Sequence, residues 1–205
     1  MTYTVKEVFL TLQGEGGQAG RSAVFCRFAG CNLWSGREED RSTTSCRFCD
    51  TDFVGGERFA SAEALADRIQ SIWGAGLQHR LVVFTGGEPL LQLDRTLIEA
   101  VHERGFSIAI ETNGTRPLPG PVDWVTVSPK AGAELVLRTG DELKLVWPQE
   151  GVDLDAMAGL PFRLRYLQPM DGPDRERNTR LCVERCLADP RWRLSLQTHK
   201  LIGIP

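Results

Sequence analysis

The sequence has no long apolar run and no surplus of basic charge. No stretch approaches the roughly 20 apolar residues that a membrane-spanning helix needs. The 24 Lys and Arg are outnumbered by 27 Asp and Glu, and a formal net charge of −3 leaves no basic stripe for nucleic acid or an acidic membrane. Residues 1–16 lack the basic start, apolar middle and small-residue cleavage site of a signal peptide. We therefore expect a cytoplasmic protein that binds neither membranes nor nucleic acid.

Internal repeats, low-complexity tracts and interdomain linkers are also missing. A chain of 205 residues is long enough to bury a substantial core, and its 41% hydrophobic and 25% charged residues are ordinary for a globular protein. The sequence therefore predicts a single domain that spans residues 1–205.

The sequence does contain six cysteines, three of which lie close together. Cys31, Cys46 and Cys49 are spaced C-x14-C-x2-C, and we expect them to be free thiols in a reducing compartment. Structural zinc usually takes four protein ligands, whereas a 4Fe–4S cluster held by three cysteines keeps one iron open for an outside ligand. S-adenosylmethionine (SAM) can bind that iron, and an electron from the cluster then cleaves its C5′–S bond. Zinc remains an alternative at this point, with Cys26 as a fourth ligand.

Apolar periodicity predicts strands that alternate with helices. The predicted strands cover residues 4–11, 22–29, 80–86, 106–112, 123–128, 142–147, 162–168 and 193–199. The predicted helices cover residues 61–74, 90–104 and 174–189. Residues 30–60 are irregular, and their Ser, Thr, Gly and charged residues suit an exposed loop that carries the cysteines.

This alternation predicts an α/β fold with a parallel sheet and right-handed crossovers. Three helices are too few for a closed eight-stranded barrel. We therefore expect a partial, open (β/α) barrel of about six parallel strands and three helices, with its site at the carboxyl ends of the strands.

The predicted strand at 80–86 runs into TGGEP, residues 85–89. Two glycines let the backbone approach a ligand without a Cβ in the way, and Glu88 places a carboxylate beside it. Such a turn can receive the methionyl ammonium group of SAM. Taken alone, TGGEP is more often an ordinary strand-to-helix turn with Pro89 near the helix start. Its position, one helix and one strand after a Cys-x-x-Cys loop, favours SAM binding.

Eight short motifs follow one another along the chain. They are LQGEGGQAGR (12–21), FCRFAGCNLW (25–34), CDT (49–51), FTGGEPLLQ (84–92), ETNGT (111–115), SPK (128–130), QPMDG (168–172) and HKLIGIP (199–205). This ordered set resembles the radical SAM superfamily and, more narrowly, the 7-carboxy-7-deazaguanine synthase family. The superfamily usually has C-x3-C-x2-C, so this chain carries eleven extra residues between its first two cysteines. That insertion resembles a variant known within the narrower family.

The resemblance implies a lyase that converts 6-carboxy-5,6,7,8-tetrahydropterin to 7-carboxy-7-deazaguanine with loss of ammonia, on the route to queuosine and other 7-deazapurines. A 5′-deoxyadenosyl radical abstracts hydrogen from C6 of the pterin, the carbon radical rearranges to a five-membered ring, and hydrogen returns to regenerate SAM. The implied cofactors are a 4Fe–4S cluster, SAM and magnesium. The implied partners are the pterin substrate, flavodoxin or ferredoxin as electron donor, and a second copy of the chain in a homodimer.

The resemblance also assigns the cofactor-binding residues. Cys31, Cys46 and Cys49 are the implied cluster ligands, and Thr51 resembles the magnesium ligand because a hydroxyl oxygen suits a hard cation. The residues that align with SAM contacts are Phe48, Cys49, Asp50, Gly87, Glu88, Ser128, Pro129, Lys130, Gln168, Pro169, Met170 and Asp171. Without the resemblance, Thr51 is interpreted as a loop residue and Lys130 as a solvated lysine.

Substrate contacts are implied at the other motifs. Arg27 lies in an otherwise apolar strand, where an arginine usually reaches for water, but its planar guanidinium group also matches the substrate's carboxylate. The other expected substrate residues are Leu12, Gln13, Gly14, Glu15, Thr85, Glu111, Asn113, His199 and Pro205. We expect the tail, residues 198–205, to be ordered and buried, closing the substrate site.

Two other functions remain open. An activating enzyme that abstracts hydrogen from a glycyl residue of a partner protein shares the cluster and TGGEP, but usually lacks LQGEG and HKLIGIP. A zinc-binding interaction module would have no affinity for SAM. Cys182 and Cys186, at i and i+4 of the third predicted helix, are interpreted as core residues, as is Cys26.

Overall fold

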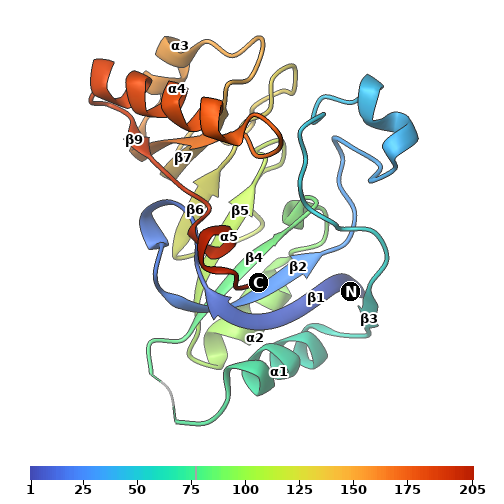
Figure 1. The fold of residues 1–205 in the computed structure, drawn as a ribbon. Helices are drawn as coiled ribbons and strands as arrows, with labels where there is room; N and C mark the ends of the chain where they lie inside the picture. The colour runs from blue at the N-terminus through green and yellow to red at the C-terminus, as the bar shows by residue number, and fades with distance from the viewer. Residues whose placement is uncertain (77) are drawn as a thin grey trace.

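The computed structural model describes residues 1–76 and 78–205, and within these ranges nine strands form one sheet (Figure 1). The strand order is β3-β1-β2-β4-β5-β6-β7-β8-β9. The strands are β1 (Tyr3–Leu12), β2 (Ser22–Phe28), β3 (Glu57–Phe59), β4 (Leu81–Gly86), β5 (Ser107–Thr112), β6 (Trp124–Val127), β7 (Gly140–Trp147), β8 (Phe162–Pro169) and β9 (Arg193–Leu194). Strands β3 and β9 are the two edges, so the described sheet stays open, as predicted.

Seven of the described strands, β2 and β4 to β9, run parallel to their neighbours, one more than predicted. β1 instead pairs antiparallel with both β2 and β3. Only residues 13–21 connect β1 to β2, which is too short for the crossover that a parallel pair needs. β3 lies within residues 30–60, which were predicted to be irregular throughout.

The described residues form five α-helices, of which three were predicted. They are α1 (Ala62–Trp73), α2 (Arg95–Glu103), α3 (Leu154–Ala158), α4 (Arg175–Ala188) and α5 (Thr198–Ile202). α2 begins later than predicted because Pro89–Leu91 forms a separate 3₁₀ turn and Asp94 then caps the helix, accepting a hydrogen bond from Leu97 N at 2.9 Å. None of the helices in the described ranges has the length and apolar character needed to cross a membrane.

Residues 193–199 were predicted as one strand, but only Arg193–Leu194 pairs with β8. The following segment turns into α5, which was not predicted. α3 was also missed, because five residues are too few for an apolar period to stand out.

Helices cover the outer face of the sheet, α1 and α2 at one end and α4 at the other (Figure 1). Val82 and Phe84 of β4 pack with them in the main core, whereas Val83 belongs to a small inner cluster with Ala109 of β5. Two residues further along the same inner face come Thr85 and Glu111, because strand side chains alternate between faces. The inner face therefore changes from apolar to polar at the carboxyl ends of the strands.

Candidate active site

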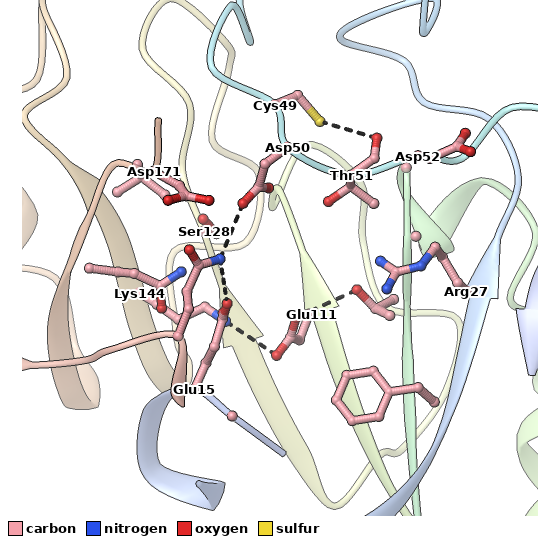
Figure 2. Close-up of a pocket in the computed structure, with 18 of the residues that line it drawn as sticks. Glu15, Arg27, Cys49, Asp50, Thr51, Asp52, Glu111, Ser128, Lys144 and Asp171 are labelled. Atoms are coloured by element: carbon pink, nitrogen blue, oxygen red, sulfur yellow. Dashed lines mark hydrogen bonds and ion pairs between the residues drawn. The ribbon is translucent and has the colours of Figure 1, made fainter. Parts of the chain in front are cut away.

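A cavity of about 420 Å³ lies at the carboxyl ends of the parallel strands. Its walls include Arg27 near the end of β2, Thr85 near the end of β4, Glu111 near the end of β5 and Gln168 near the end of β8. Figure 2 shows Arg27 on one side of this pocket, Glu15, Lys144 and Asp171 on the other, and Glu111 between them. The site is thus where the open-barrel prediction placed it.

Cys31, Cys46 and Cys49 all line this cavity. Leu33 N donates a hydrogen bond to Cys31 Sγ at 3.4 Å. A hydrogen bond with the Cys46 thiol lowers the pKa of Cys49 and so favours its thiolate, the form that binds metal.

The cysteine set fits an iron–sulfur cluster better than zinc. No group of three or more His, Cys, Asp or Glu side chains in the described part of the chain is arranged to hold a single metal ion. Three thiolates leave one iron of a 4Fe–4S cluster open, whereas structural zinc usually takes four protein ligands. Cys26, the candidate fourth zinc ligand, is fully buried in the main core, and so is Cys182. Cys186 is half-buried and packs against the same core.

The residues inserted between Cys31 and Cys46 fold over the Cys-x-x-Cys turn. Trp34 is buried and makes an edge-to-face contact with Phe53 at a centroid distance of 5.6 Å. The Arg41 guanidinium lies 4.1 Å from the centroid of the Trp34 ring and donates to the carbonyl oxygens of Arg47 at 2.9 Å and Cys49 at 3.0 Å. The insertion therefore supports the turn that carries two of the three thiols.

The glycines of TGGEP bring the end of β4 against the segment before Cys31. Gly87 N donates to Phe28 O at 3.2 Å, and Glu88 N donates to Gly30 O at 2.9 Å. A Cβ on Gly87 would collide with the carbonyl oxygen of Gly30. A glycine is needed here because two backbone segments meet beside the cluster residues.

Glu88, which was predicted to contact SAM, is not among the residues that line the cavity. Its carboxylate is fully buried and accepts hydrogen bonds from Thr112 Oγ1 at 2.7 Å and Asn113 N at 2.8 Å. Burial raises its pKa. Glu88 thus fixes the end of β5 from behind the cavity wall, and β5 in turn carries Glu111.

Lys130 is not the solvated lysine that its sequence context allowed. Its ammonium group donates to Ser128 O at 2.6 Å and Ser128 Oγ at 2.7 Å, and burial lowers its pKa. Both residues line the cavity. The positive charge of Lys130 attracts the thiolates of Cys46 and Cys49 and so favours their charged forms.

A charged network forms the wall opposite Arg27. Lys144 of β7 forms ion pairs with Glu15, from the β1–β2 connection, and with Glu111, at 3.2 Å. Gln13 Nε2 also donates to Glu111 at 2.9 Å, and Gln197 Nε2 donates to Glu15 at 3.0 Å. Four segments far apart in the sequence therefore meet at this wall: the β1–β2 connection, β5, β7 and the segment before α5.

The tail contributes His199, Lys200 and Pro205 to the lining of the cavity. Lys200 donates to Asp50 at 2.7 Å and to Asp171 at 2.6 Å, and Thr11 Oγ1 donates to Pro205 O at 2.8 Å. Figure 1 shows the C-terminus beside β1. Contrary to prediction the tail is not buried, since Leu201, Ile202 and Pro205 are exposed. Polar contacts rather than apolar burial hold it.

The structure brings most of the predicted site residues to this one cavity. Those that line it are Leu12, Gln13, Gly14, Glu15, Arg27, Cys31, Cys46, Phe48, Cys49, Asp50, Thr51, Thr85, Gly87, Glu111, Asn113, Ser128, Lys130, Gln168, Pro169, Asp171, His199 and Pro205. Pro129 and Met170, like Glu88, lie outside the lining. Their backbone groups hold neighbouring segments, with Pro129 O accepting from Gln149 at 3.5 Å and Met170 N donating to Trp147 O at 2.8 Å.

Sequence reasoning missed several polar residues of the cavity, among them Glu7, Lys144, Gln197 and Lys200. Glu7 accepts from Arg27 Nε at 2.7 Å. Lys144 could have been predicted from the sequence. Its neighbours in ELKLVW are apolar core residues, and because side chains alternate between the two faces of a strand, Lys144 lies on the inner face.

Comparisons with known proteins agree with this site. Residues 41–142 match the Radical SAM superfamily, a range that includes Cys46 and Cys49. Full-length relatives called 7-carboxy-7-deazaguanine synthase are 61% identical in Caulobacter vibrioides and 60% identical in Bordetella pertussis, with 100% of both chains covered. A crystal structure of QueE from Escherichia coli matches with a TM-score of 0.72 at 34% identity, covering 96% of this chain and 94% of that one.

Proposed function

The chain belongs to the 7-carboxy-7-deazaguanine synthase family of radical SAM enzymes, and from this premise we propose that its cavity converts 6-carboxy-5,6,7,8-tetrahydropterin to 7-carboxy-7-deazaguanine with release of ammonia. The observation that carries the proposal is the shared cavity. The three thiols of C-x14-C-x2-C line the same space as an arginine and two carboxylates that suit a small, polar, carboxylated ring. This meeting of groups is what a ring-modifying radical enzyme needs.

The cysteines and the adjacent backbone form the cofactor side of the cavity. We assign Cys31, Cys46 and Cys49 to a 4Fe–4S cluster. The remaining lining residues of the TGGEP, SPK and QPMDG motifs are assigned to SAM. When bound, cluster and SAM supply one-electron chemistry that removes a hydrogen atom from the substrate.

The opposite side of the cavity orients the substrate. Glu7 holds Arg27 by its Nε, and the terminal nitrogens of the guanidinium group point into the pocket, where they suit a carboxylate (Figure 2). Glu15 and Glu111 supply acceptors for ring N–H groups. The tail, through Lys200, covers the mouth and limits the entry of water.

Magnesium is assigned to Thr51, which lines the same cavity as Arg27. Magnesium prefers oxygen ligands and usually keeps several that are not from the protein. A substrate carboxylate held by Arg27 is therefore well placed to be one of them.

Reduction of the cluster needs an electron donor, and we propose flavodoxin or ferredoxin for this role. We also propose that the chain is one domain, acts as a homodimer and works in the cytoplasm. The free thiol state of all six cysteines supports a reducing compartment.

Anaerobic reconstitution with iron and sulfide tests the function. Reduced protein is incubated with SAM, magnesium and the carboxypterin, and products are followed by mass spectrometry. We expect a brown protein that forms 7-carboxy-7-deazaguanine, an activity that Cys49→Ala abolishes and Cys186→Ala retains. SAM cleavage with the pterin unchanged would refute the substrate, and a colourless, zinc-containing protein would refute the reaction class.

A further inference from the structure

Lys144 is a buried cation in the middle of β7. Its side chain is only 5% exposed, and the flanking Leu143 and Leu145 point into the core on the other face of the sheet. A charge in such a position is costly unless opposite charges and hydrogen bonds compensate for it. Its surroundings show what compensates for it.

Three carboxylates surround the Lys144 ammonium group. Glu15 and Glu111 form ion pairs with it, and Glu142, two residues earlier on β7, faces it from the same strand. Burial opposes the charge of Lys144, but these carboxylates outweigh it and raise its pKa. Burial likewise opposes the charge of Glu15, and the attraction of Lys144 still lowers its pKa.

Glu15 and Glu111 come from different parts of the chain, and both line the cavity. Both carboxylates contact the same ammonium group, so they lie close to each other. Without a cation between them they would repel each other, and one would take up a proton. Gln13, Gln197 and Thr85 donate hydrogen bonds to the same two carboxylates, but such neutral donors compensate for the repulsion less than a cation does. Lys144 is therefore what allows both carboxylates to face the cavity in the charged form.

We propose that Lys144 is a positioning residue that holds Glu15 and Glu111 together as a pair of ionised acceptors for the ring N–H groups of the substrate. This inference rests on the proposed function, since it concerns how the carboxypterin is recognised. An ionised pair only accepts hydrogen bonds, so it selects a ring edge rich in donors and rejects one rich in acceptors. Lys144 thereby determines specificity without touching the substrate.

The test needs a variant that folds, because removing Lys144 alone leaves three buried carboxylates without their cation. The double variant Glu142→Gln/Lys144→Met removes one negative and one positive charge together. Glutamine at 142 can still accept from Gly17 N, which donates to Glu142 at 2.7 Å. Glu142→Gln alone is the matched control, since Glu142 is outside the cavity lining and Lys144 stays in place.

Binding of the carboxypterin is measured by calorimetry on cluster-loaded, unreduced enzyme with SAM, so that no turnover occurs. We expect the double variant to bind roughly 10- to 100-fold more weakly than the control, with SAM binding unchanged. The charge-preserving Lys144→Arg variant should recover part of the loss.

The pH dependence separates positioning from a purely structural role. The titratable groups around position 144 are Glu15, Glu111 and Glu142, with Lys130 also within electrostatic range. Without the lysine, the remaining carboxylate pair holds a proton near neutral pH, so binding by the double variant should tighten from about pH 6 to about pH 8 relative to the control. Wild-type binding should follow the control.

Each outcome decides the matter. If the double variant and the control bind the carboxypterin equally at every pH while the wild type still forms product, the proposed role of Lys144 is wrong. The proposed function would then stand. A lower melting temperature with unchanged affinity per folded molecule overturns the role of Lys144 too, because Lys144 would then be structural. A wild type that neither binds nor converts the carboxypterin overturns the proposed function and this inference with it.

Discussion

Single side chains hold parts of the site in place through hydrogen bonds to the backbone and through ion pairs. Arg41 does not itself line the cavity, yet it donates hydrogen bonds to two carbonyl oxygens of the turn that carries Cys46 and Cys49. Its aromatic contact with Trp34 and its ion pair with Glu38 hold the guanidinium in place. Arg27 is held in a similar way by Glu7.

Replacing Arg41 with alanine should weaken cluster retention, because the cysteine turn loses two charge-assisted hydrogen bonds. We expect roughly tenfold faster loss of iron to a chelator under anaerobic conditions. Arg37→Ala is the matched control, as Arg37 is exposed and pairs only loosely with Glu39, at 3.6 Å. Equal iron loss in the two variants would show that the insertion does not support the turn.

Replacing Arg27 with lysine should raise the KM for the carboxypterin by roughly tenfold, because a point charge cannot match a carboxylate in the bidentate way of a guanidinium group. SAM affinity should not change. Steady-state kinetics give both values, and Arg21→Lys, at an exposed position of the β1–β2 connection, is the control. An unchanged KM contradicts the assignment of Arg27 to the substrate.

Among the elements, the short helix α5 connects the tail to two separate parts of the cavity wall. It contains five residues, and Thr198 N and Oγ1 both donate to Gly14 O, at 3.0 and 2.9 Å. A Cβ on Gly14 would collide with the His199 ring, so a glycine is what lets the tail approach this closely. Lys200 then links Asp50, beside the cluster residues, to Asp171 after β8.

Replacing Lys200 with alanine should release the tail from the cavity mouth. We expect the KM for the carboxypterin to rise severalfold, with more SAM cleaved per product formed, because water enters an open site. Leu201→Ala is the control, since Leu201 is 59% exposed. A product ratio equal to that of the control would show that the tail does not cover the reaction.

The link between Lys200 and Asp171 should be lost in acid. The hydrogen bond from Lys200 lowers the pKa of Asp171, so its contribution is complete above the unfolded Asp pKa of about 3.9 and fades as pH falls through the lower folded value. Between about pH 5 and pH 9 the tail contact should be constant. Hydrogen exchange of the α5 amides across this range checks it, and a step near neutral pH would contradict it.

In the whole molecule, the β1–β2 connection crosses the open side of the sheet. Gly16 N donates to Ser195 Oγ at 2.9 Å, and Gly17 N donates to Glu142 at 2.7 Å, so the start of the chain contacts β7 and the segment after β9. Opening these contacts would leave buried polar groups without partners. The sheet leaves the cavity open on one side, and polar side chains of the β1–β2 connection close that side.

The core and the site should be separable by mutation. Ile110 is fully buried beside Glu111 but points to the opposite face of β5. Ile110→Ala should cost roughly 2–5 kcal/mol of unfolding free energy, while Leu187→Ala, at an 82% exposed position, should cost little. Chemical denaturation measures both values. A stability loss below that of Leu187→Ala would contradict the assignment of Ile110 to the core.

Much of the fold was predictable because its signals are local. The apolar periods of α1, α4 and the parallel strands lie within single segments, and Ser61 and Gly74 mark the two ends of α1. The cysteine spacing and the TGGEP turn are also short patterns. Glu88 shows the limit of this reasoning, because the motif indicated a carboxylate near the ligand but not the face to which it turns.

The sequence by itself determined the long helices, most of the strands and the spacing of the thiols, but not the short elements β3, α3 and α5. Only the tertiary structure decided that β1 runs antiparallel, that Arg41 braces the cysteine turn, and that Lys144 joins Glu15 to Glu111. The physical reason is the distance along the sequence over which each kind of interaction acts. Backbone periodicity and covalent spacing act over a few residues, whereas charge pairing and packing act through space between segments that are brought together only when the chain folds.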